Sequence, residues 1–333
     1  MKAAVLGAGS WGTTFAQVLC DAGTPAVLCC RRPEIADAIN RRHENPGRLP
    51  GVSLPPALTA TCDPAQALAG TDLVVLAVPA QSLRANLAAW AGAGLLPPGA
   101  LLVSLMKGVE LDTCARMSEV IAQAADVPAR QIAVVSGPNL ALEIARRQHA
   151  ATVVACTDDR AAEQLQQACH TAYFRPYTNR DVIGCELGGA VKNVIALAVG
   201  IAIGMGLGDN TRAMLMTRGL AEISRLGEAL GADQLTLSGL AGLGDLAASC
   251  SSPLSRNRAV GEALGRGTPL DEVLASTTET AEGVKSSQSI RELARKHGVE
   301  MPITEVIAAV LHEGLAVGQA ALLLAGRPAT RER

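Results

Sequence analysis

A glycine-rich segment near the start of the chain has the spacing of a phosphate-binding turn. The segment Gly7-Ala8-Gly9-Ser10-Trp11-Gly12 fits G-x-G-x-x-G, directly after an apolar run and directly before a helical pattern. In such a turn the first glycine permits the tight turn, the second lets a pyrophosphate approach the backbone, and the third lets helix and strand pack closely. Its place between a strand and a helix favours dinucleotide binding over a glycine-rich turn without a ligand.

Two arginines follow the second predicted strand. A site that prefers NAD(H) usually has an acidic residue there, about 20 residues after the glycines, which binds the ribose 2′-hydroxyl. Here Arg31 and Arg32 take that place, and guanidinium groups match the geometry of a 2′-phosphate. We therefore expect a preference for NADP(H), with NAD(H) as the second cofactor. Ordinary solvated arginines at a strand end are the alternative.

Several polar residues lie in segments that are otherwise apolar or glycine-rich. A buried charge without a partner is costly, so each of these residues needs a partner or a ligand. They are Lys107, Lys192-Asn193, Asp245 and Ser255-Arg256-Asn257. A structural ion pair, for example of Glu186 or Lys192, is the alternative for any one of them. The set as a whole favours a ligand site.

The elements that must position these residues change in kind along the chain. From Lys2 to about Tyr177, short aliphatic runs alternate with helical segments. This pattern predicts strands at 3–6, 26–30, 73–78, 101–105, 132–135 and 152–155, with helices near 11–22, 33–42, 64–69, 112–124 and 159–169. Strands that alternate with helices predict a mostly parallel α/β sheet covered on both faces, as in a Rossmann-like dinucleotide-binding domain.

After about Asn179 the strand pattern ends. The remaining chain predicts helices at 181–203, 210–230, 256–265, 282–297 and 303–325. We therefore expect an NAD(P)-binding Rossmann-like domain at 1–180 and an all-α substrate-binding and catalytic domain at 181–333. No long Pro/Ser linker separates them, so we expect close packing and a cleft.

Composition excludes several classes of protein. The 333 residues carry 29 Lys plus Arg against 31 Asp plus Glu, a net charge of -2, and only six aromatic residues, so a nucleic acid is not an expected partner. The five histidines show no metal-ligand spacing, and we expect no metal. The nine cysteines form no C-x-x-C pair, which indicates free thiols in a cytoplasmic protein.

Neither a signal peptide nor an integral membrane segment is expected. The apolar run before Gly7 is too short for a signal peptide. The uncharged stretch 85–106 contains Pro97-Pro98 and three glycines, and the stretch 193–208 is shorter than the roughly 20 residues of a membrane span.

Short motifs in both halves resemble those of NAD(P)-dependent glycerol-3-phosphate dehydrogenase of the prokaryotic type. They are L-G-G-A-V-K-N at 187–193, A-G-L-G-D-L at 241–246 and S-R-N-R at 255–258, with Ser136-Gly137-Pro138 and Ala281-Glu282-Gly283. The resemblance runs from residue 2 to about 327. It implies an oxidoreductase that reversibly reduces dihydroxyacetone phosphate to sn-glycerol 3-phosphate with NAD(P)H and feeds glycerophospholipid synthesis. The family also suggests a homodimer.

The resemblance implies roles for individual residues. Lys192 matches the family's catalytic proton donor and acceptor, with Lys107 beside it. The substrate-binding positions are Lys107, Gly137, Asn139, Lys192, Asn193, Asp245, Ser255, Arg256 and Asn257. The cofactor-binding positions are Gly7, Gly9, Ser10, Trp11, Gly12, Arg31, Arg32, Lys107, Ala141, Arg256, Thr280 and Glu282. The family's G-P-[ST]-x-A segment has Ser or Thr where this chain has Asn139, and Phe where it has Leu140.

Neighbouring residues suggest how the site is built. Gly188, one helical turn before Lys192, would let a ligand approach the backbone. Arg256 and Asn257, at a helix start after Pro253, would hold a substrate phosphate through side chains and helix N–H groups. Asp245 would either orient a lysine or bind a substrate hydroxyl, and the sequence leaves both open.

Two other functions compete with this one. A β-hydroxyacid or 6-phosphogluconate-type dehydrogenase would share the Rossmann domain, the helical domain and a Lys-Asn pair. Asp245 and the 255–257 stretch favour the glycerol phosphate enzyme. A catalytically inactive NADP(H)-sensing protein would keep the glycine turn, but it would not need both Lys107 and Lys192.

Overall fold

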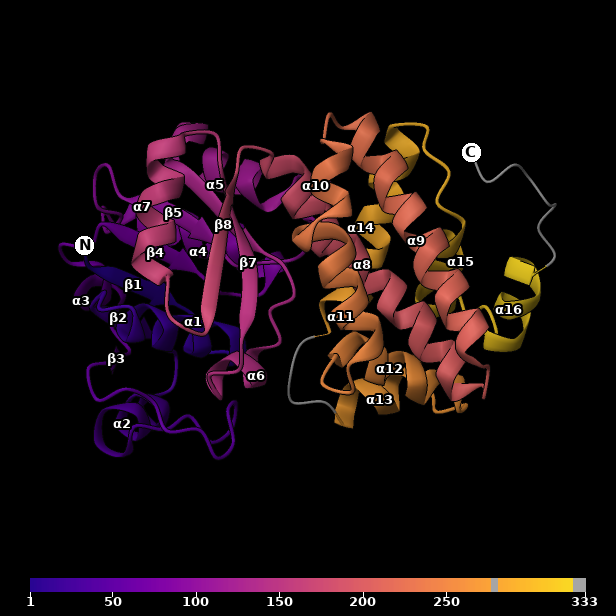
Figure 1. Ribbon diagram of the computed structural model, residues 1–333, viewed down its shortest axis with the longest axis horizontal. Helices are drawn as coiled ribbons and strands as arrows, with labels where there is room; N and C mark the ends of the chain where they lie inside the picture. The colour runs from indigo at the N-terminus through magenta and orange to yellow at the C-terminus, as the bar shows by residue number, and fades with distance from the viewer. Residues whose placement is uncertain (277–280, 326–333) are drawn as a thin grey trace.

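The computed structural model describes residues 1–276 and 281–325 (Figure 1). In these residues, one eight-stranded sheet has the order β3-β2-β1-β4-β5-β6-β7-β8. Neighbouring strands pair in parallel, except for the antiparallel pair β6 and β7. The strands are β1 (Ala3–Leu6), β2 (Ala26–Cys29), β3 (Thr59–Thr61), β4 (Leu73–Leu76), β5 (Leu101–Ser104), β6 (Ile132–Ser136), β7 (Ala150–Cys156) and β8 (Phe174–Asn179). The expected mostly parallel sheet is confirmed.

Helices cover both faces of this sheet. They are α1 (Ser10–Asp21), α2 (Pro33–Arg42), α3 (Pro64–Leu68), α4 (Leu83–Gly92), α5 (Met117–Ala125), α6 (Ala141–Ala145) and α7 (Asp159–Cys169), with the 3-10 turns η1 (Ala80–Ser82) and η2 (Ala129–Gln131). Every residue of β1 is buried, and alternate residues face separate cores. Ala3 and Val5 pack with Phe15, whereas Ala4 and Leu6 pack with Leu87. This two-sided burial explains why the central strands are continuous aliphatic runs.

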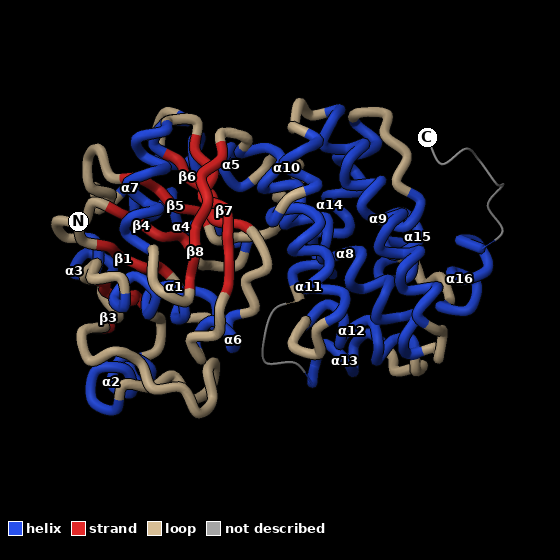
Figure 2. The backbone as a smooth tube through the Cα atoms, viewed as in Figure 1, coloured by secondary structure: helices blue, strands red, loops and turns tan. Residues whose placement is uncertain are grey.

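The second half of the chain is helical in its described part, and Figure 2 shows the strands confined to the other half. Its elements are α8 (Val182–Gly204), α9 (Asp209–Ala229), α10 (Gln234–Ser238), the π-helical turn η3 (Leu240–Gly244), α11 (Asp245–Ser251), α12 (Arg256–Gly265), α13 (Leu270–Ser276), α14 (Glu282–Lys296), α15 (Pro302–His312) and α16 (Val317–Ala325). The change from sheet to helices falls between Asn179 and Val182, where the sequence predicts a domain boundary.

Helix α8 forms the centre of the helical half. Its length and mean hydropathy of 1.8 would suit a membrane span, but 89% of its most apolar 18-residue stretch is buried inside the protein. It packs against α9, α11, α12 and α14, and also against β6 of the sheet. Helix α8 is therefore a core helix, and it connects the two halves.

Glycines bring α8 and α12 to backbone contact. A Cβ atom at Gly200 would lie 2.1 Å from the carbonyl oxygen of Arg258, and one at Gly204 would lie 2.2 Å from that of Glu262. From the other side, a Cβ at Gly261 would lie 2.2 Å from the oxygen of Leu197. The crossing thus excludes any side chain larger than hydrogen at these positions.

Several predicted elements need correction. The helix expected at 112–124 begins only at Met117, because Cys114 has a φ of 60° and Arg116 pairs with Val109 in an isolated bridge. The helix expected at 303–325 is interrupted after His312, where Gly314 takes a φ of 73°. Strands β3 and β8 and helices α4 and α6 were not predicted, since they are short or lack a clear periodicity.

Candidate active site

The glycine turn lies where a dinucleotide would bind. It follows β1 at the sheet position where the strand order reverses, between β1 and β4. Gly7 has a φ of 123°, and a Cβ atom at Gly12 would lie 2.1 Å from the Gly7 carbonyl oxygen. At Gly9, by contrast, a Cβ would meet nothing within 4 Å, and no side chain caps the start of α1. Open space beside uncapped helix N–H groups fits a pyrophosphate.

Two other predicted cofactor residues lie in this turn. The Ser10 hydroxyl donates to the Arg48 carbonyl oxygen at 3.2 Å. Trp11 packs its ring 5.7 Å from Phe15 and 6.3 Å from Phe174, which anchors the turn to the core. Its buried indole N–H has no hydrogen-bond partner in the described parts of the chain. A buried donor of this kind normally has an acceptor, so a ligand atom is a candidate for it.

Arg31 and Arg32 follow β2, the strand next to β1, and both are exposed. The Arg32 guanidinium lies 3.7 Å from the Glu34 carboxylate, in a pair whose side chains are 59% and 68% exposed. Such an exposed pair is weak, so the arginine can exchange Glu34 for another anion. The position fits the adenosine end of a dinucleotide.

A buried carboxylate holds the two predicted lysines together. Asp245, the first residue of α11, is 2% exposed and accepts from Lys107 Nζ at 2.6 Å and from Lys192 Nζ at 2.8 Å. Lys107 comes from the loop after β5 and Lys192 from α8, so three distant segments meet here. Lys107 Nζ also donates to the Gly137 carbonyl oxygen at 2.9 Å. Of the two roles left open for Asp245, the contacts support the orientation of lysines.

The cluster carries excess positive charge. Two ammonium groups share one carboxylate, and Arg256 adds a third cation whose field reaches Lys107. The pKa of Lys107 is lowered to about 8, chiefly by burial; Lys192 and Arg256 also lower it, whereas Asp245 raises it. A site with this charge attracts an anion and holds an amine that can exchange a proton near neutral pH.

A chain of amide hydrogen bonds ties the cluster to the neighbouring helices. Asn193 donates to the carbonyl oxygen of Lys107 at 3.2 Å, and its Oδ1 accepts from Asn257 Nδ2 at 2.9 Å. Asn257 Oδ1 in turn accepts from the Gly283 N–H at 3.1 Å. Asn193 and Asn257 therefore fix the relative positions of the Lys107 loop, α8, α12 and α14.

Ser255 and Arg256 mark the start of α12. Ser255 is the N-cap, and its hydroxyl accepts from the Arg258 N–H at 3.4 Å. Arg256 is the first helical residue, as the sequence predicted. The helix start thus presents a guanidinium beside backbone N–H groups, which is an arrangement that binds phosphate.

Glu282 is a buried carboxylate at the start of α14. Its Oε1 accepts from the N–H of Ala80, the first residue of η1, at 3.4 Å, while its Oε2 has no partner within residues 1–276 and 281–325. Burial raises the pKa of Glu282. An unsatisfied acceptor beyond the carboxyl end of β4 fits a carboxamide donor such as that of nicotinamide.

The segment after β6 lies against β7. Gly137 has a φ of 144°, and the Asn139 side chain donates to the Thr152 hydroxyl at 3.0 Å. Ala141 begins α6, and its carbonyl oxygen accepts from the Thr14 hydroxyl at 3.2 Å, which joins this segment to α1. Asn139 thus takes a defined place although the family usually has Ser or Thr there.

Not every sequence interpretation holds. Gly188 does not open space for a ligand, because a Cβ there would lie 2.4 Å from the Ala241 carbonyl oxygen; it packs α8 against η3. Thr280 lies outside the described residues. Glu186 forms the structural ion pair considered as an alternative, since its carboxylate accepts from Arg116 at 2.6 Å.

The sequence interpretation missed a hydroxyl group in the cluster. Lys192 Nζ donates to Ser249 Oγ at 2.5 Å. Ser249 lies four residues after Asp245 in α11, so the two side chains share a helix face. That spacing could have identified it.

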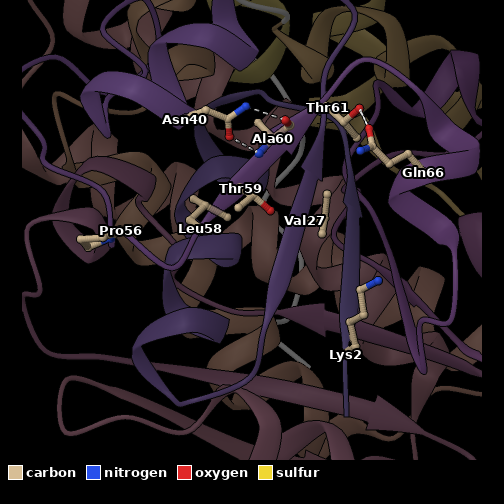
Figure 3. Close-up of a pocket in the computed structure, with 9 residues that line it drawn as sticks. All are labelled: Lys2, Val27, Asn40, Pro56, Leu58, Thr59, Ala60, Thr61 and Gln66. Carbon is tan, nitrogen blue, oxygen red and sulfur yellow. Dashed lines mark hydrogen bonds between the residues drawn. The ribbon is translucent and has the colours of Figure 1, made fainter.

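A separate hollow lies beside β2 and β3 (Figure 3). Its lining includes Lys2, Val27, Asn40, Thr59 and Gln66, and none of the residues of the lysine cluster. It carries no chemistry comparable to that of the cluster, which therefore remains the candidate active site. In the described residues no group of His, Cys, Asp and Glu side chains could hold a metal ion.

Comparison with protein families gives matches in both halves. A family model described as the NAD-dependent glycerol-3-phosphate dehydrogenase N-terminus matches residues 2–162, and one described as the C-terminus of the same enzyme matches residues 181–321.

Individual proteins resemble the whole chain. A glycerol-3-phosphate dehydrogenase [NAD(P)+] from Thermobifida fusca is 64% identical over 333 residues, 100% of this chain and 98% of its own length. One from Streptomyces griseus is 63% identical with the same coverage. A crystal structure of glycerol-3-phosphate dehydrogenase from Coxiella burnetii superposes with a TM-score of 0.93 at 36% identity and covers 98% of this chain and 99% of its own.

Proposed function

The chain belongs to the NAD-dependent glycerol-3-phosphate dehydrogenase family, and from this premise we propose how its residues carry out the reaction. It is an NAD(P)-dependent oxidoreductase with glycerol-3-phosphate dehydrogenase activity. The direction we propose is reduction of dihydroxyacetone phosphate to sn-glycerol 3-phosphate, a precursor of glycerophospholipids. The family membership favours this function over a β-hydroxyacid dehydrogenase or an inactive sensor.

In our proposal the dinucleotide lies across the glycine turn. Gly7, Gly9 and Gly12 give the pyrophosphate access to the N-terminus of α1, and Glu282 accepts a hydrogen bond at the nicotinamide end. When bound, the nicotinamide supplies or takes up the hydride. The protein must then hold the carbonyl carbon of the substrate near it and manage one proton.

The observation that carries the proposal is the Asp245 carboxylate, which contacts both Lys107 and Lys192. As negative charge grows on the carbonyl oxygen, an ammonium group neutralises it and donates a proton. We assign this donation to Lys192, with Ser249 and Asp245 holding its Nζ. Lys107 binds the substrate beside it. Positioned proton transfer of this kind contributes typically about 10²- to 10⁴-fold.

The substrate phosphate, we propose, binds at the start of α12. Arg256 supplies the guanidinium, and Ser255 caps the helix so that its N–H groups remain oriented. Asn257 and Asn193 keep this helix end at a fixed distance from Lys192 through their shared hydrogen bond. Charge and geometry together select a small phosphorylated ketone.

An assay of NADPH oxidation with dihydroxyacetone phosphate tests the function. The wild-type enzyme should oxidise the cofactor only when the ketone is present. Lys192→Ala should lose about 10²-fold or more in kcat while it binds cofactor normally. Near-normal kcat in this variant would refute the role of Lys192, and an inactive wild type would refute the function.

The finer cofactor preference needs its own experiment. We propose that Arg31 and Arg32 favour NADP(H) through the 2′-phosphate. Replacement of both by Ala should raise KM for NADPH about tenfold or more and leave KM for NADH nearly unchanged. Arg41→Ala and Arg42→Ala, at the other end of α2, are matched surface controls. Equal kcat/KM for the two cofactors in the wild type would refute the preference.

Two further expectations accompany this function. We propose a cytoplasmic enzyme, since its thiols are unpaired and its one long apolar helix in the described residues is core. We also propose a homodimer, from the family alone. Light scattering during size-exclusion chromatography measures the mass directly.

A further inference from the structure

Asn139 follows a segment that contacts the lysine cluster. The carbonyl oxygen of Gly137, two residues earlier, accepts a hydrogen bond from Lys107 Nζ, so this segment is tied to one of the two lysines. The Asn139 Nδ2 atom donates to Thr152 Oγ1 at 3.0 Å. Its Oδ1 atom is buried and accepts no hydrogen bond from any described residue. A buried acceptor without a partner in the protein is open to a donor from an ordered water or from a ligand.

Thr152 decides which end of the amide faces the ligand. A threonine hydroxyl has one hydrogen, and Thr152 donates it to the Ser136 carbonyl oxygen at 3.0 Å. Toward Asn139 the hydroxyl can therefore only accept, which requires the NH₂ end of the amide. A flipped amide would bring two oxygen acceptors together without a hydrogen between them.

The surrounding structure fixes the position of the Thr152 side chain. Its side chain is fully buried in β7, opposite the end of β6. A Cβ atom at position 137 would lie 3.2 Å from the Thr152 Cα and 3.3 Å from its Oγ1, so Gly137 leaves the room that this contact needs. The hydroxyl at 152 cannot turn away without losing its carbonyl acceptor.

We propose that Thr152 is a positioning residue that fixes Asn139 as an acceptor for the free hydroxyl of the triose phosphate. The inference rests on the proposed function. A Ser or Thr at position 139 could rotate its hydroxyl to suit the ligand, whereas an amide must be oriented by a neighbour. Dihydroxyacetone phosphate has a single hydroxyl group, and that group would donate to Asn139 Oδ1.

Thr152→Val removes the hydroxyl and keeps the shape of the side chain. We expect kcat/KM for dihydroxyacetone phosphate to fall about tenfold, the usual scale for one buried hydrogen bond. KM for the cofactor should not change. Thr152→Ser, which keeps the hydroxyl, should restore kcat/KM to within about threefold of the wild type.

A substrate without the hydroxyl separates positioning from a general structural effect. With hydroxyacetone phosphate, as substrate or as competitive inhibitor, wild type and Thr152→Val should differ by less than about twofold, because the contact is absent in both. Likewise, Thr152→Val should have no further effect in an Asn139→Ala background. An equal loss with both substrates, or an undiminished loss in that background, would overturn the inference.

Controls keep these outcomes distinct. Thr71→Val removes a buried hydroxyl that donates to the Leu68 carbonyl oxygen, outside the site, and should leave the kinetics unchanged. If Thr152→Val does not fold, as judged by its melting transition, Thr152→Ala makes the same test. An active wild type with an unaffected Thr152 variant refutes this inference alone, whereas an inactive wild type refutes the proposed function as well.

Discussion

The shared carboxylate of Asp245 makes a quantitative prediction about stability. Asp245→Asn keeps the shape of the side chain but leaves two buried ammonium groups without their counterion. Removing one partner of a buried ion pair costs about 3–5 kcal/mol when the other charge stays. Lys107 has a pKa of about 8, so giving up its proton at pH 7 costs only about 1.4 kcal/mol. Deprotonation of Lys107 is therefore the cheaper response.

Because Lys107 loses its proton, the loss of unfolding free energy caused by Asp245→Asn depends on pH. In the wild type below pH 8, Lys107 is protonated in both the folded and the unfolded state, so it adds no pH dependence there. In the folded variant it is neutral while the unfolded chain still binds the proton. The free energy of unfolding of the variant then falls by about 1.4 kcal/mol for each unit of decreasing pH. The difference from wild type should be smallest at pH 9 and about 3 kcal/mol larger at pH 6.

Urea unfolding followed by circular dichroism at 222 nm, at pH 6, 7, 8 and 9, measures this difference. Asp181→Asn is a matched control, because the Asp181 carboxylate caps α8 by accepting from the Gly184 and Asp233 N–H groups, which do not titrate. Its cost should be the same at each pH. A constant difference for Asp245→Asn, or one that is larger at pH 9 than at pH 6, would refute the reasoning.

Three further predictions concern single residues. Gly12→Ala should destabilise the protein by about 1–3 kcal/mol and weaken cofactor binding at least about tenfold, since its Cβ would lie 2.1 Å from the Gly7 carbonyl oxygen; fluorescence titration with NADPH measures the affinity. Cys62 is the exposed thiol, whereas burial raises the pKa of thiols such as Cys30. Native protein should therefore react rapidly with about one equivalent of a thiol reagent, and Cys62→Ser should abolish this rapid reaction. Arg256→Lys should raise KM for dihydroxyacetone phosphate about tenfold with little change in kcat, because an ammonium cannot replace the forked contact; an unchanged KM would remove Arg256 from the phosphate site.

The sequence predicts best what neighbouring residues determine. The glycine turn, the start of α12 at Arg256 and the change from strands to helices near residue 180 follow from local patterns, and each lies at the predicted place. A charged residue in an apolar run, such as Lys192, also signals a required partner. These features are encoded within a few residues, so no knowledge of the tertiary structure is needed.

Contacts between segments that are distant in the sequence could not be predicted from it. Lys107 and Asp245 are 138 positions apart, and nothing in either segment specifies the other. Thr152 resembles any strand residue in sequence, and its contact with Asn139 depends on the antiparallel pairing of β6 and β7, the exception in this sheet. Gly188 was misread for the same reason, because its neighbour is the backbone of Ala241 rather than a ligand.

The glycine crossing of α8 and α12 affects how a substitution at Gly200 or Gly204 would show itself in an assay. Gly200 and Gly204 meet carbonyl oxygens of α12, which cannot rotate away as a side chain would. An added methyl group would push α12 away from α8. Arg256 would move with α12 and therefore lie farther from Lys192. Such a change would present as poor substrate affinity although the altered residue touches no ligand. The crossing thus sets the distance between Lys192 on α8 and Arg256 on α12. This distance depends on glycines that a survey of active-site residues would not include.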